Sequence, residues 1–327
     1  MPIQSALKRK LMLLTALVIV LAAPHAIAQP TSQIVRLVVP YAAGGPADLL
    51  ARLFAPGLQA ALGQTVIVEN RPGAGSQIGA RYVAAAHKDG KTILIGNAST
   101  FAIVPSTQKN PGFDPLRSFT HLGLIAETDT ALVVSPSFAG GAVKDLVAYA
   151  KDNPGKVSYA SAGVGNGAHL IGELLQSTAH VEMTHVPYKS GGEMMTAVVG
   201  EQVSFAVVDL TSALPMVREG KLKALAVTGP ARSTELPQVP TMAEAGYPAV
   251  SMPYWTGTSV PASTPDEVVR TLEAAVRRVT TSPDYLAALK KFGAHVKPTD
   301  GKGMSTLIAV DLKRWGDVAR QANIQLD

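Results

Sequence analysis

Two glycine-rich segments of the sequence carry residue types that bind anions through the backbone. Tyr41–Asp48 reads YAAGGPAD and follows a strand-like run, and Ser161–His169 reads SAGVGNGAH and follows another. Small residues expose backbone N–H groups, and the N-terminus of a helix adds a partial positive charge. Ligands of open α/β sheets bind beyond the carboxyl ends of the strands, so the two segments predict a grip on an anion. The alternative interpretation is a short strand-to-helix turn at each place, since glycine commonly serves turns.

Three side chains near these segments have two open roles each. Asp48 either stabilises the N-terminus of the helix that begins around Pro46 or lines the pocket. Tyr188 either offers its hydroxyl to a ligand or packs at the edge of the core. Asp209 either holds a loop or faces the ligand. An acid there would repel a carboxylate unless water or an ammonium group intervened.

The sequence lacks the residue patterns of common catalytic, metal-binding and nucleotide-binding sites. The sequence has no cysteine, no G-x-S-x-G, no H-E-x-x-H and no P-loop, and none of its seven histidines lies three or four residues from another. The segment 73–79 resembles a dinucleotide fingerprint, but its spacing is G-x-G-x-x-x-G and no acid follows Gly96-Asn97 to hold a ribose. It is interpreted as a tight turn with close helix packing. The sequence thus predicts no catalytic residue, metal or cofactor, and a protein that is not an enzyme.

The elements that position these residues alternate between strands and helices, which favours parallel sheets covered by helices. Strands are predicted at 34–39, 65–68, 92–95, 131–134, 157–160, 183–186, 205–208 and 224–228. Helices are predicted at 47–62, 75–86, 143–151, 168–177, 265–280, 283–292 and 302–321.

The pattern restarts midway, so it predicts two α/β lobes joined by crossovers at 121–131 and about 228–258. The final helices are expected to return to the first half. The predicted first lobe is residues 29–125 and 230–327, and the second is 126–229.

Residues 1–28 have the three parts of a secretory signal peptide. Lys8-Arg9-Lys10 is basic, Leu11–Ala23 is apolar, and Ala26-Ile27-Ala28 offers small residues for cleavage before Gln29. The alternative is a membrane anchor, but a spanning helix needs roughly 20 apolar residues, and this run is shorter. We expect an exported, periplasmic protein without its signal peptide.

Charge and composition narrow the possible partners. The chain has 327 residues, 47% of them hydrophobic, and a net charge of +5. Three positive charges lie in the signal segment, so 26 basic and 24 acidic residues remain. That balance, with only 5% aromatic residues, argues against nucleic-acid binding.

Four motifs in order resemble one known family. They are Val38–Asp48, Val68–Gly75, His185–Lys189 and Pro240–Gly246, and the likeness runs from about Val35 to Ile324. The sequence resembles the substrate-binding proteins of tripartite tricarboxylate transporters, the TctC or Bug family. The resemblance implies a two-lobed type II periplasmic-binding-protein (Venus flytrap) fold of class α/β. It also implies delivery of a carboxylate to a permease of one large and one small subunit, TctA- and TctB-like.

The family's counterparts of the two glycine-rich segments grip a ligand carboxylate through backbone amides, small polar side chains and ordered water. We expect the amides of Ala43–Gly45 and Gly163–Gly167 to be the main donors, and the lobes to close about hinges in the two crossovers. The candidate ligand-binding residues are Tyr41, Ala43, Gly44, Gly45, Pro46, Ala47, Asp48, Ser161, Gly163, Gly165, Asn166, Gly167, His169, Tyr188 and Asp209.

The expected function is a monomeric solute-binding protein for transport, and the alternative is a carboxylate sensor that presents its ligand to a membrane signalling protein. Both need closure on a ligand. The sequence departs from the family pattern at Ser190, at Gly200–Ser204 and at Val164–Ala168, and so leaves the ligand's identity open.

Overall fold

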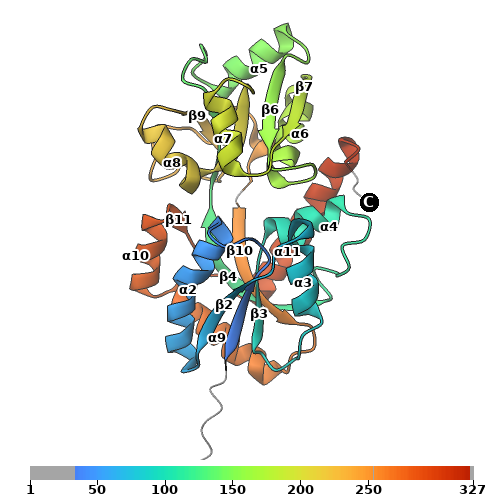
Figure 1. Cartoon of the computed structure of the whole chain (residues 1–327), viewed down its shortest axis with the longest axis vertical. Helices are drawn as coiled ribbons and strands as arrows, with labels where there is room; N and C mark the ends of the chain where they lie inside the picture. The colour runs from blue at the N-terminus through green and yellow to red at the C-terminus, as the bar shows by residue number, and fades with distance from the viewer. Residues whose placement is uncertain (1–33, 253, 325–327) are drawn as a thin grey trace, which may run out of the picture. The chain divides into compact units, whose positions relative to one another are not determined.

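The computed structural model describes residues 34–252 and 254–324, so the predicted signal peptide lies outside the described residues. This part of the chain forms two β-sheets, each with helices packed on it (Figure 1). The first sheet has the strand order β11-β4-β10-β3-β1-β2, and the second has the order β7-β6-β8-β5-β9. The strands are β1 (Val35–Val39), β2 (Val66–Asn70), β3 (Thr92–Asn97), β4 (Phe119–Thr128), β5 (Thr130–Val134), β6 (Val157–Ser161), β7 (Met183–Pro187), β8 (Phe205–Asp209), β9 (Lys223–Val227), β10 (Tyr254–Pro261) and β11 (Ala294–His295).

Helices follow most of the parallel strands. The first, α2, fits the prediction for 47–62: Pro46 is its first residue, Leu50, Phe54 and Leu58 form its buried stripe, and Gly63 ends it in the left-handed conformation. The helices are α2 (Pro46–Leu62), η1 (Ala74–Ser76), α3 (Gln77–Ala84), η2 (Ser99–Ile103), α4 (Val104–Thr107), α5 (Val143–Asp152), α6 (Gly167–Ala179), α7 (Gly191–Val199), α8 (Leu210–Arg218), η3 (Pro248–Val250), α9 (Asp266–Thr280), α10 (Pro283–Lys291) and α11 (Gly301–Gln321).

The prediction of parallel sheets is wrong in part, because both sheets are mixed. In the first sheet β1 pairs in parallel with β2 and β3, but β10 runs antiparallel to β3 and β4. In the second, β6 pairs in parallel with β7 and β8, but β5 runs antiparallel to β8 and β9. The β–α alternation indicates the parallel strands, since each of these leads into a helix. The antiparallel strands pair over long sequence distances that no local pattern reveals.

Of the two segments interpreted as crossovers, the first is largely strand and the second is strand only at its end. Residues 121–128 belong to β4, and β5 begins at Thr130, so the chain passes from one sheet to the other at Asp129. The second predicted crossover, 228–258, ends inside β10, which begins at Tyr254. The β4 sequence FTHLGLIAET mixes polar and apolar residues without strict alternation, so the pattern did not mark it as a strand. Helices α7 and α8 were also missed.

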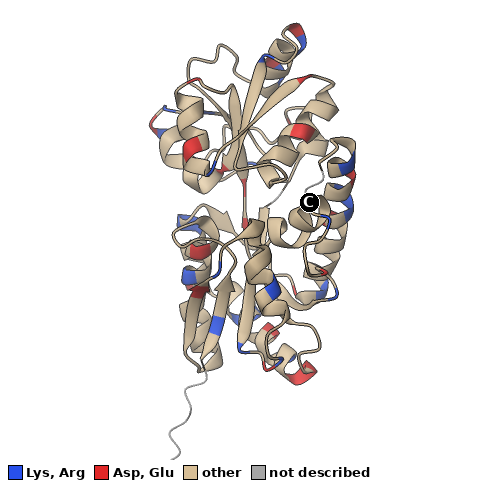
Figure 2. Cartoon of the chain, turned by 45° about the vertical axis from the view of Figure 1, so that its right-hand side comes forward, with Lys and Arg blue, Asp and Glu red and all other residues tan. Residues whose placement is uncertain are grey.

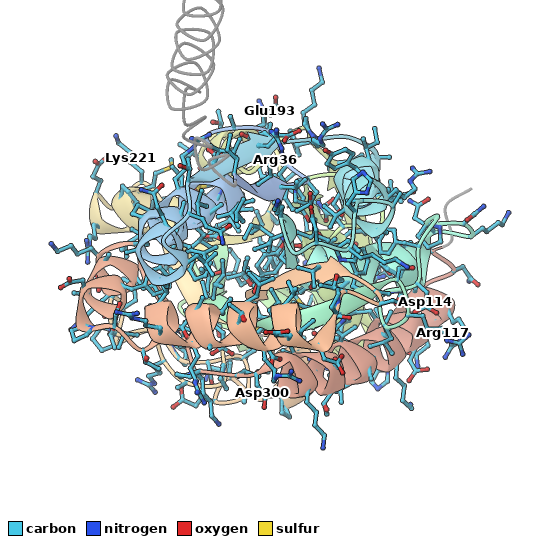
Figure 3. All side chains as sticks on the ribbon, turned by 90° about the horizontal axis from the view of Figure 1, so that it is seen from below. Arg36, Asp114, Arg117, Glu193, Lys221 and Asp300 are labelled. Carbon is cyan, nitrogen blue, oxygen red and sulfur yellow. The ribbon has the colours of Figure 1, made fainter. Side chains whose placement is uncertain are left out.

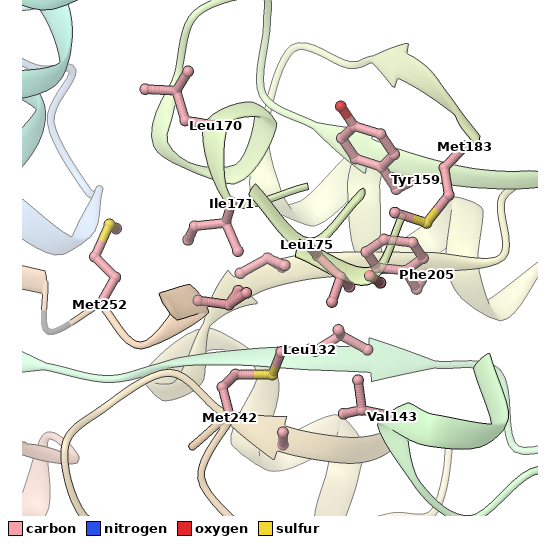
Figure 4. Close-up of a cluster of buried hydrophobic side chains, with 14 of the residues drawn as sticks. Leu132, Val143, Tyr159, Leu170, Ile171, Leu175, Met183, Phe205, Met242 and Met252 are labelled. Atoms are coloured by element: carbon pink, nitrogen blue, oxygen red, sulfur yellow. The ribbon is translucent and has the colours of Figure 1, made fainter. Parts of the chain in front are cut away.

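The second sheet is packed on one face by α5 and α6. Leu132, Tyr159 and Phe205 from the strands meet Leu170 and Leu175 of α6 in one buried cluster (Figure 4). This core holds the start of α6 fixed relative to the strand that precedes it. The loop between β6 and α6 is therefore held at both ends.

The C-terminal helix α11 packs on elements of both sheets. Its Trp315 and Val318 lie in the same buried cluster as Leu170 of α6, while Met304 and Ile308 pack with Trp255 of β10. Further along, Asp311 accepts a hydrogen bond from Trp255 at 2.7 Å. We expected the final helices to return to the first half. Helices α9 and α10 pack there, whereas α11 packs on elements of both sheets.

None of the helices described is long and apolar enough to span a bilayer. Basic and acidic side chains are interspersed over the helices (Figure 2). In a view from below, Asp114 and Arg117 lie together at the rim (Figure 3), where they form an exposed pair at 3.8 Å.

Candidate functional site

The first glycine-rich loop, Tyr41–Asp48, links β1 to α2 at the carboxyl edge of the first sheet. Gly44 has a φ of +82°, which a residue with a side chain rarely adopts. Gly45 is the N-cap of α2 and offers no side-chain oxygen to the first turn. Within the described residues no hydrogen bond engages the N–H groups of Ala43, Gly45 and Ala47. The helix N-terminus therefore presents free donors, as anion binding requires.

Asp48 anchors this loop. Its Oδ2 accepts hydrogen bonds from the Gly44 N–H and from Arg52, both at 2.9 Å, and its Oδ1 accepts one from Asn70 at 2.9 Å. Burial alone would raise the pKa of Asp48, but the hydrogen bonds from Arg52, Gly44 and Asn70 lower it to about 2. Of the two roles left open for Asp48, the contacts favour the structural one. They also engage the Gly44 amide, which was expected to bind the ligand.

Tyr41 turns its phenol toward the first sheet. The hydroxyl donates to Asn97 Oδ1 at 2.8 Å and lies 3.0 Å from the hydroxyl of Thr100. Tyr254, at the start of β10, donates similarly to Ser99 at 3.2 Å. Burial raises the pKa of both phenols, so both stay neutral. This edge is lined by uncharged hydrogen-bonding groups.

The sequence analysis did not single out Ser76, nor Asn97 and Thr100, which bond the Tyr41 hydroxyl. The segment Gly73–Gly79 was interpreted as a tight turn with close packing, and an added Cβ at Gly79 would indeed lie 2.8 Å from the Pro40 Cα. The same segment, however, buries the Ser76 hydroxyl. The signal that could have found these residues is their position after the carboxyl ends of β2 and β3.

The second loop, Ser161–His169, links β6 to α6. Asn166 is the N-cap of α6, and its side-chain oxygen accepts a hydrogen bond from His169 N–H at 2.9 Å. The Gly165 N–H donates to His169 Nδ1 at 3.0 Å, and the Gly163 N–H donates to Ser161 Oγ at 3.2 Å. The Asn166 N–H donates to Gly163 O at 3.4 Å, so three of the predicted donors are already engaged. The N–H groups of Val164 and Gly167 have no partner among the described residues.

Two stacked imidazoles lie beneath this loop. The rings of His169 and His185 are 3.8 Å apart and nearly parallel, and His185 Nε2 is 2.5 Å from Ser161 Oγ. The pKa of each histidine is lowered to about 4, mainly by burial, and at His185 also by the charge that a protonated His169 would carry. Both are neutral at pH 7, which leaves His169 Nδ1 free to accept from Gly165.

Tyr188 and Asp209 lie at the same edge of the second sheet as this loop. The Tyr188 N–H donates to Ser161 O at 2.8 Å, and its partly buried side chain packs against the buried cluster that contains Met194 and Val208. Asp209 ends β8 and caps α8, accepting from Thr211 N at 3.0 Å and Thr211 Oγ1 at 2.5 Å. Burial raises the pKa of Asp209. Asp209 therefore holds the start of α8, as one of its two open roles required.

Elements of the two sheets contact one another at two places. A Cβ added to Gly167, the first residue of α6, would lie 3.3 Å from Ile103 of η2 and 3.7 Å from Met252. On the other side, a Cβ added to Gly293 would lie 3.3 Å from Thr211 of α8. The start of α6, which the second loop leads into, therefore packs against η2, which follows β3 of the first sheet.

The arrangement has no features of a catalytic centre. Among the described residues, no three His, Asp or Glu side chains are grouped so that they could hold a metal ion. Ser161 and His185 are hydrogen-bonded, but Ser161 also bonds the backbone of Gly163, and no acid orients the imidazole. Among the described residues, Ser161 and His185 therefore do not form a catalytic triad.

Comparison with known proteins agrees with this geometry. Residues 50–324 match the family described as "Tripartite tricarboxylate transporter family receptor", TctC. The periplasmic binding protein BugD is 34% identical in structure-based comparison, with a TM-score of 0.78 over 89% of this chain and 98% of that one.

Two further structures contain ligands. MatC from Rhodopseudomonas palustris, with bound malate, is 32% identical, with a TM-score of 0.77 over 87% of this chain and 98% of that one. Rpa4515 from R. palustris, with adipate, is 33% identical, with a TM-score of 0.80 over 91% and 99%. Proteins of this family are substrate-binding proteins and not enzymes, and their α/β fold is the two-lobed type II periplasmic-binding-protein fold. The chain belongs to the TctC family of periplasmic solute-binding proteins, the receptors of tripartite tricarboxylate transporters.

Proposed function

We propose that this protein captures a small carboxylate between its two sheets and delivers it to a tripartite tricarboxylate-type membrane transporter. The observation that carries the proposal is the pair of helix N-termini at α2 and α6. Each follows a glycine-rich loop and retains backbone N–H groups that no described residue engages. Two such N-termini bind an anion without burying a charged side chain.

The amides that would hold the carboxylate follow from the hydrogen bonds of the loops. Ala43, Gly45 and Ala47 offer free N–H groups in the first loop, and Val164 and Gly167 do so in the second. The other candidate residues shape the loops. These are Tyr41, Gly44, Pro46, Asp48, Ser161, Gly163, Gly165, Asn166 and His169, with Tyr188 and Asp209 at the edge of the second sheet.

Closure between two lobes would complete the site. In this proposal residues 29–125 and 230–327 form one lobe, and residues 126–229 form the other. The chain passes between the sheets at Asp129 and within 228–253, so these positions are the natural hinges. Small-angle scattering should show a smaller radius of gyration with saturating ligand than without.

The ligand class is supported by the relatives. MatC binds malate and Rpa4515 binds adipate, and both are carboxylates. We extend to this chain the proposal of cleavage after Ala28, a periplasmic location, a monomeric state and TctA- and TctB-like permease subunits as partners.

A thermal-shift screen tests the proposed function. The mature protein is unfolded and refolded to remove any bound ligand, and malate, succinate, adipate, lactate and propionate are added in turn. A ligand that binds only the folded state raises Tm, and at 100 times Kd it contributes about 2.7 kcal/mol. The proposal predicts a clear rise with at least one acid. The control is the same refolded protein with an equal concentration of chloride. If this control unfolds cooperatively and no carboxylate raises Tm above its value, the proposed function is wrong.

A further inference from the structure

The Ser76 hydroxyl is buried but makes no hydrogen bond. Ser76 is 1% exposed, and its Oγ has no partner among the described residues. A buried polar atom without a partner lowers stability, and such atoms in folded proteins require an explanation. Ser76 ends η1, in the connection from the carboxyl end of β2 to α3.

The backbone around Ser76 is strained. Four consecutive residues have positive φ: Gly73 at 131°, Ala74 at 46°, Gly75 at 62° and Ser76 at 93°. Positive φ is unfavourable for residues with a Cβ, so Ala74 and Ser76 are held in a conformation that neither prefers. Strain of this kind persists where the surrounding structure enforces it, and it is common at ligand sites.

Asn97 has a second unused group at the same edge. Its Oδ1 accepts hydrogen bonds from Thr100 N at 3.0 Å and from Tyr41 OH at 2.8 Å, which fixes the orientation of the amide. No hydrogen bond among the described residues engages Asn97 Nδ2, although the residue is only 4% exposed. Nδ2 can only donate.

Ser76 and Asn97 both lie next to the Tyr41 phenol. Burial raises the pKa of Tyr41, and hydrogen bonds with Thr100 and Asn97 partly offset that rise. The Ser76 hydroxyl also lowers the pKa of Tyr41, so it lies near the phenol, but its geometry does not make a hydrogen bond. The strands β2, β1 and β3 are neighbours and parallel, so the residues at their carboxyl ends meet at one edge. Tyr41 opens the first loop, so this pair of unused groups borders the free amides of that loop.

The chemistry of the pair selects what it can bind. The hydrogen bonds at Tyr41, Asn97 and Thr100 involve no Lys, Arg or His side chain. A second carboxylate placed here would lose its water without gaining a counter-charge. An ammonium group cannot accept from Asn97 Nδ2. A hydroxyl can accept from Nδ2 while bonding Ser76 Oγ, and a carbonyl can accept from both.

We propose that Ser76 and Asn97 form a subsite for a neutral oxygen substituent of the ligand, a hydroxyl or a carbonyl, so that hydroxy and oxo acids are the preferred substrates. The inference rests on the proposed carboxylate-binding function and adds the substrate class. The carboxylate is held by the free amides of the loops, and the oxygen substituent satisfies the two unused groups.

Two matched ligand pairs and one substitution test the subsite. Calorimetry on the refolded mature protein compares malate with succinate and lactate with propionate, which differ by one hydroxyl in each pair. In the wild type the hydroxylated acid should bind at least tenfold more tightly. In Ser76→Ala this ratio should shrink to about threefold or less, since one of the two partners remains.

The Tm of the ligand-free protein distinguishes a ligand-binding role of Ser76 from a structural one. Because the Ser76 hydroxyl is unpaired, Ser76→Ala should leave the ligand-free Tm unchanged or higher. The matched control is Ser106→Ala, whose hydroxyl donates to Leu312 O at 3.3 Å. That variant should lower Tm and keep the full hydroxyl preference. Ser76→Gly, which relieves the positive φ, serves as a second variant if Ser76→Ala folds poorly.

The outcomes separate the two proposals. If the acids bind but the ratio is the same in the wild type and both Ser76 variants, the subsite is wrong and carboxylate binding stands. Tighter binding of aspartate than of malate would also overturn the subsite, because an ammonium cannot accept from Asn97. If adipate binds the wild type but none of these four acids does, the subsite is wrong and carboxylate binding stands. If no acid of the thermal-shift screen binds, the proposed function itself fails and takes the inference with it.

Discussion

The two loops at the proposed site have the same position in their sheets but are held by different chemistry. In the first loop the carboxylate of Asp48 ties together Gly44, Arg52 and Asn70. In the second loop the stabilising groups are neutral. Asn166 caps α6, and His169 Nδ1 accepts a hydrogen bond from the Gly165 N–H. The first loop therefore depends on a charge that persists to low pH, and the second on an imidazole that is neutral only above its pKa. Two loops at equivalent positions in their sheets can thus differ in how their stability depends on pH.

The largest expected effect comes from removing the anchor of the first loop. Asp48→Ala leaves the Gly44 N–H, Asn70 and Arg52 without their acceptor, so the free energy of unfolding should fall by about 3 kcal/mol. Urea unfolding at pH 7 measures it. Arg52→Ala is the control, because the Arg52 side chain is 52% exposed and its loss should lower stability much less than the loss of Asp48. Equal losses of unfolding free energy in the two variants would mean that Asp48 contributes only its exposed ion pair with Arg52.

The next effect separates the loops by pH. The folded pKa of His169 is about 4 and the unfolded value is 6.5, so the unfolded chain binds more protons between these values. Stability is therefore fully present above pH 6.5 and falls as pH drops toward 4. His169 alone should account for about 2–3 kcal/mol of that loss. For Asp48, with a folded pKa of about 2 and an unfolded value of 3.8, the loss comes only as pH falls from about 4 toward 2.

His169→Gln tests this assignment, since glutamine can accept from Gly165 but does not titrate. Urea unfolding between pH 7 and 4.5 should show a shallower loss of stability in this variant than in the wild type. Part of the loss should remain, because burial also lowers the pKa of His121 to about 4 and His185 still titrates. An unchanged pH profile would show that His169 does not carry the acid sensitivity of the second loop.

How much of this comparison the sequence predicts depends on how local the interaction is. The helix after Pro46 and the two glycine-rich loops follow from neighbouring residues, and the structure has them where expected. The stacking of His169 on His185 joins residues 16 positions apart through the fold, and no spacing rule marks it. The contact of Tyr41 with Asn97 spans 56 positions. Strand β4 was missed for the same reason, because its partners β10 and β11 come late in the chain.

The smallest effect concerns the helix caps. Asn166→Ala removes the side-chain acceptor at the start of α6 and should lower the free energy of unfolding by about 1 kcal/mol. Gly45→Ala is the matched change at the start of α2, where no side-chain cap exists and φ is −78°. It should change stability by about 0.5 kcal/mol or less. Thermal unfolding of the two variants measures the difference. A larger loss at Gly45 would contradict the view that only the second loop is capped by a side chain.

The central claim is that free backbone amides at the helix N-termini hold the ligand carboxylate, and Gly45→Val tests it most directly. At Gly45 the backbone is extended, and an added Cβ meets only Ala42 O at 3.5 Å, so the variant should fold. Gly165 is unsuitable for this test, because its φ of +76° would strain any side chain. Calorimetry with the acid that binds the wild type most tightly should show at least a tenfold loss of affinity in Gly45→Val, about 1.4 kcal/mol. Undiminished affinity in a folded Gly45→Val protein would contradict the account.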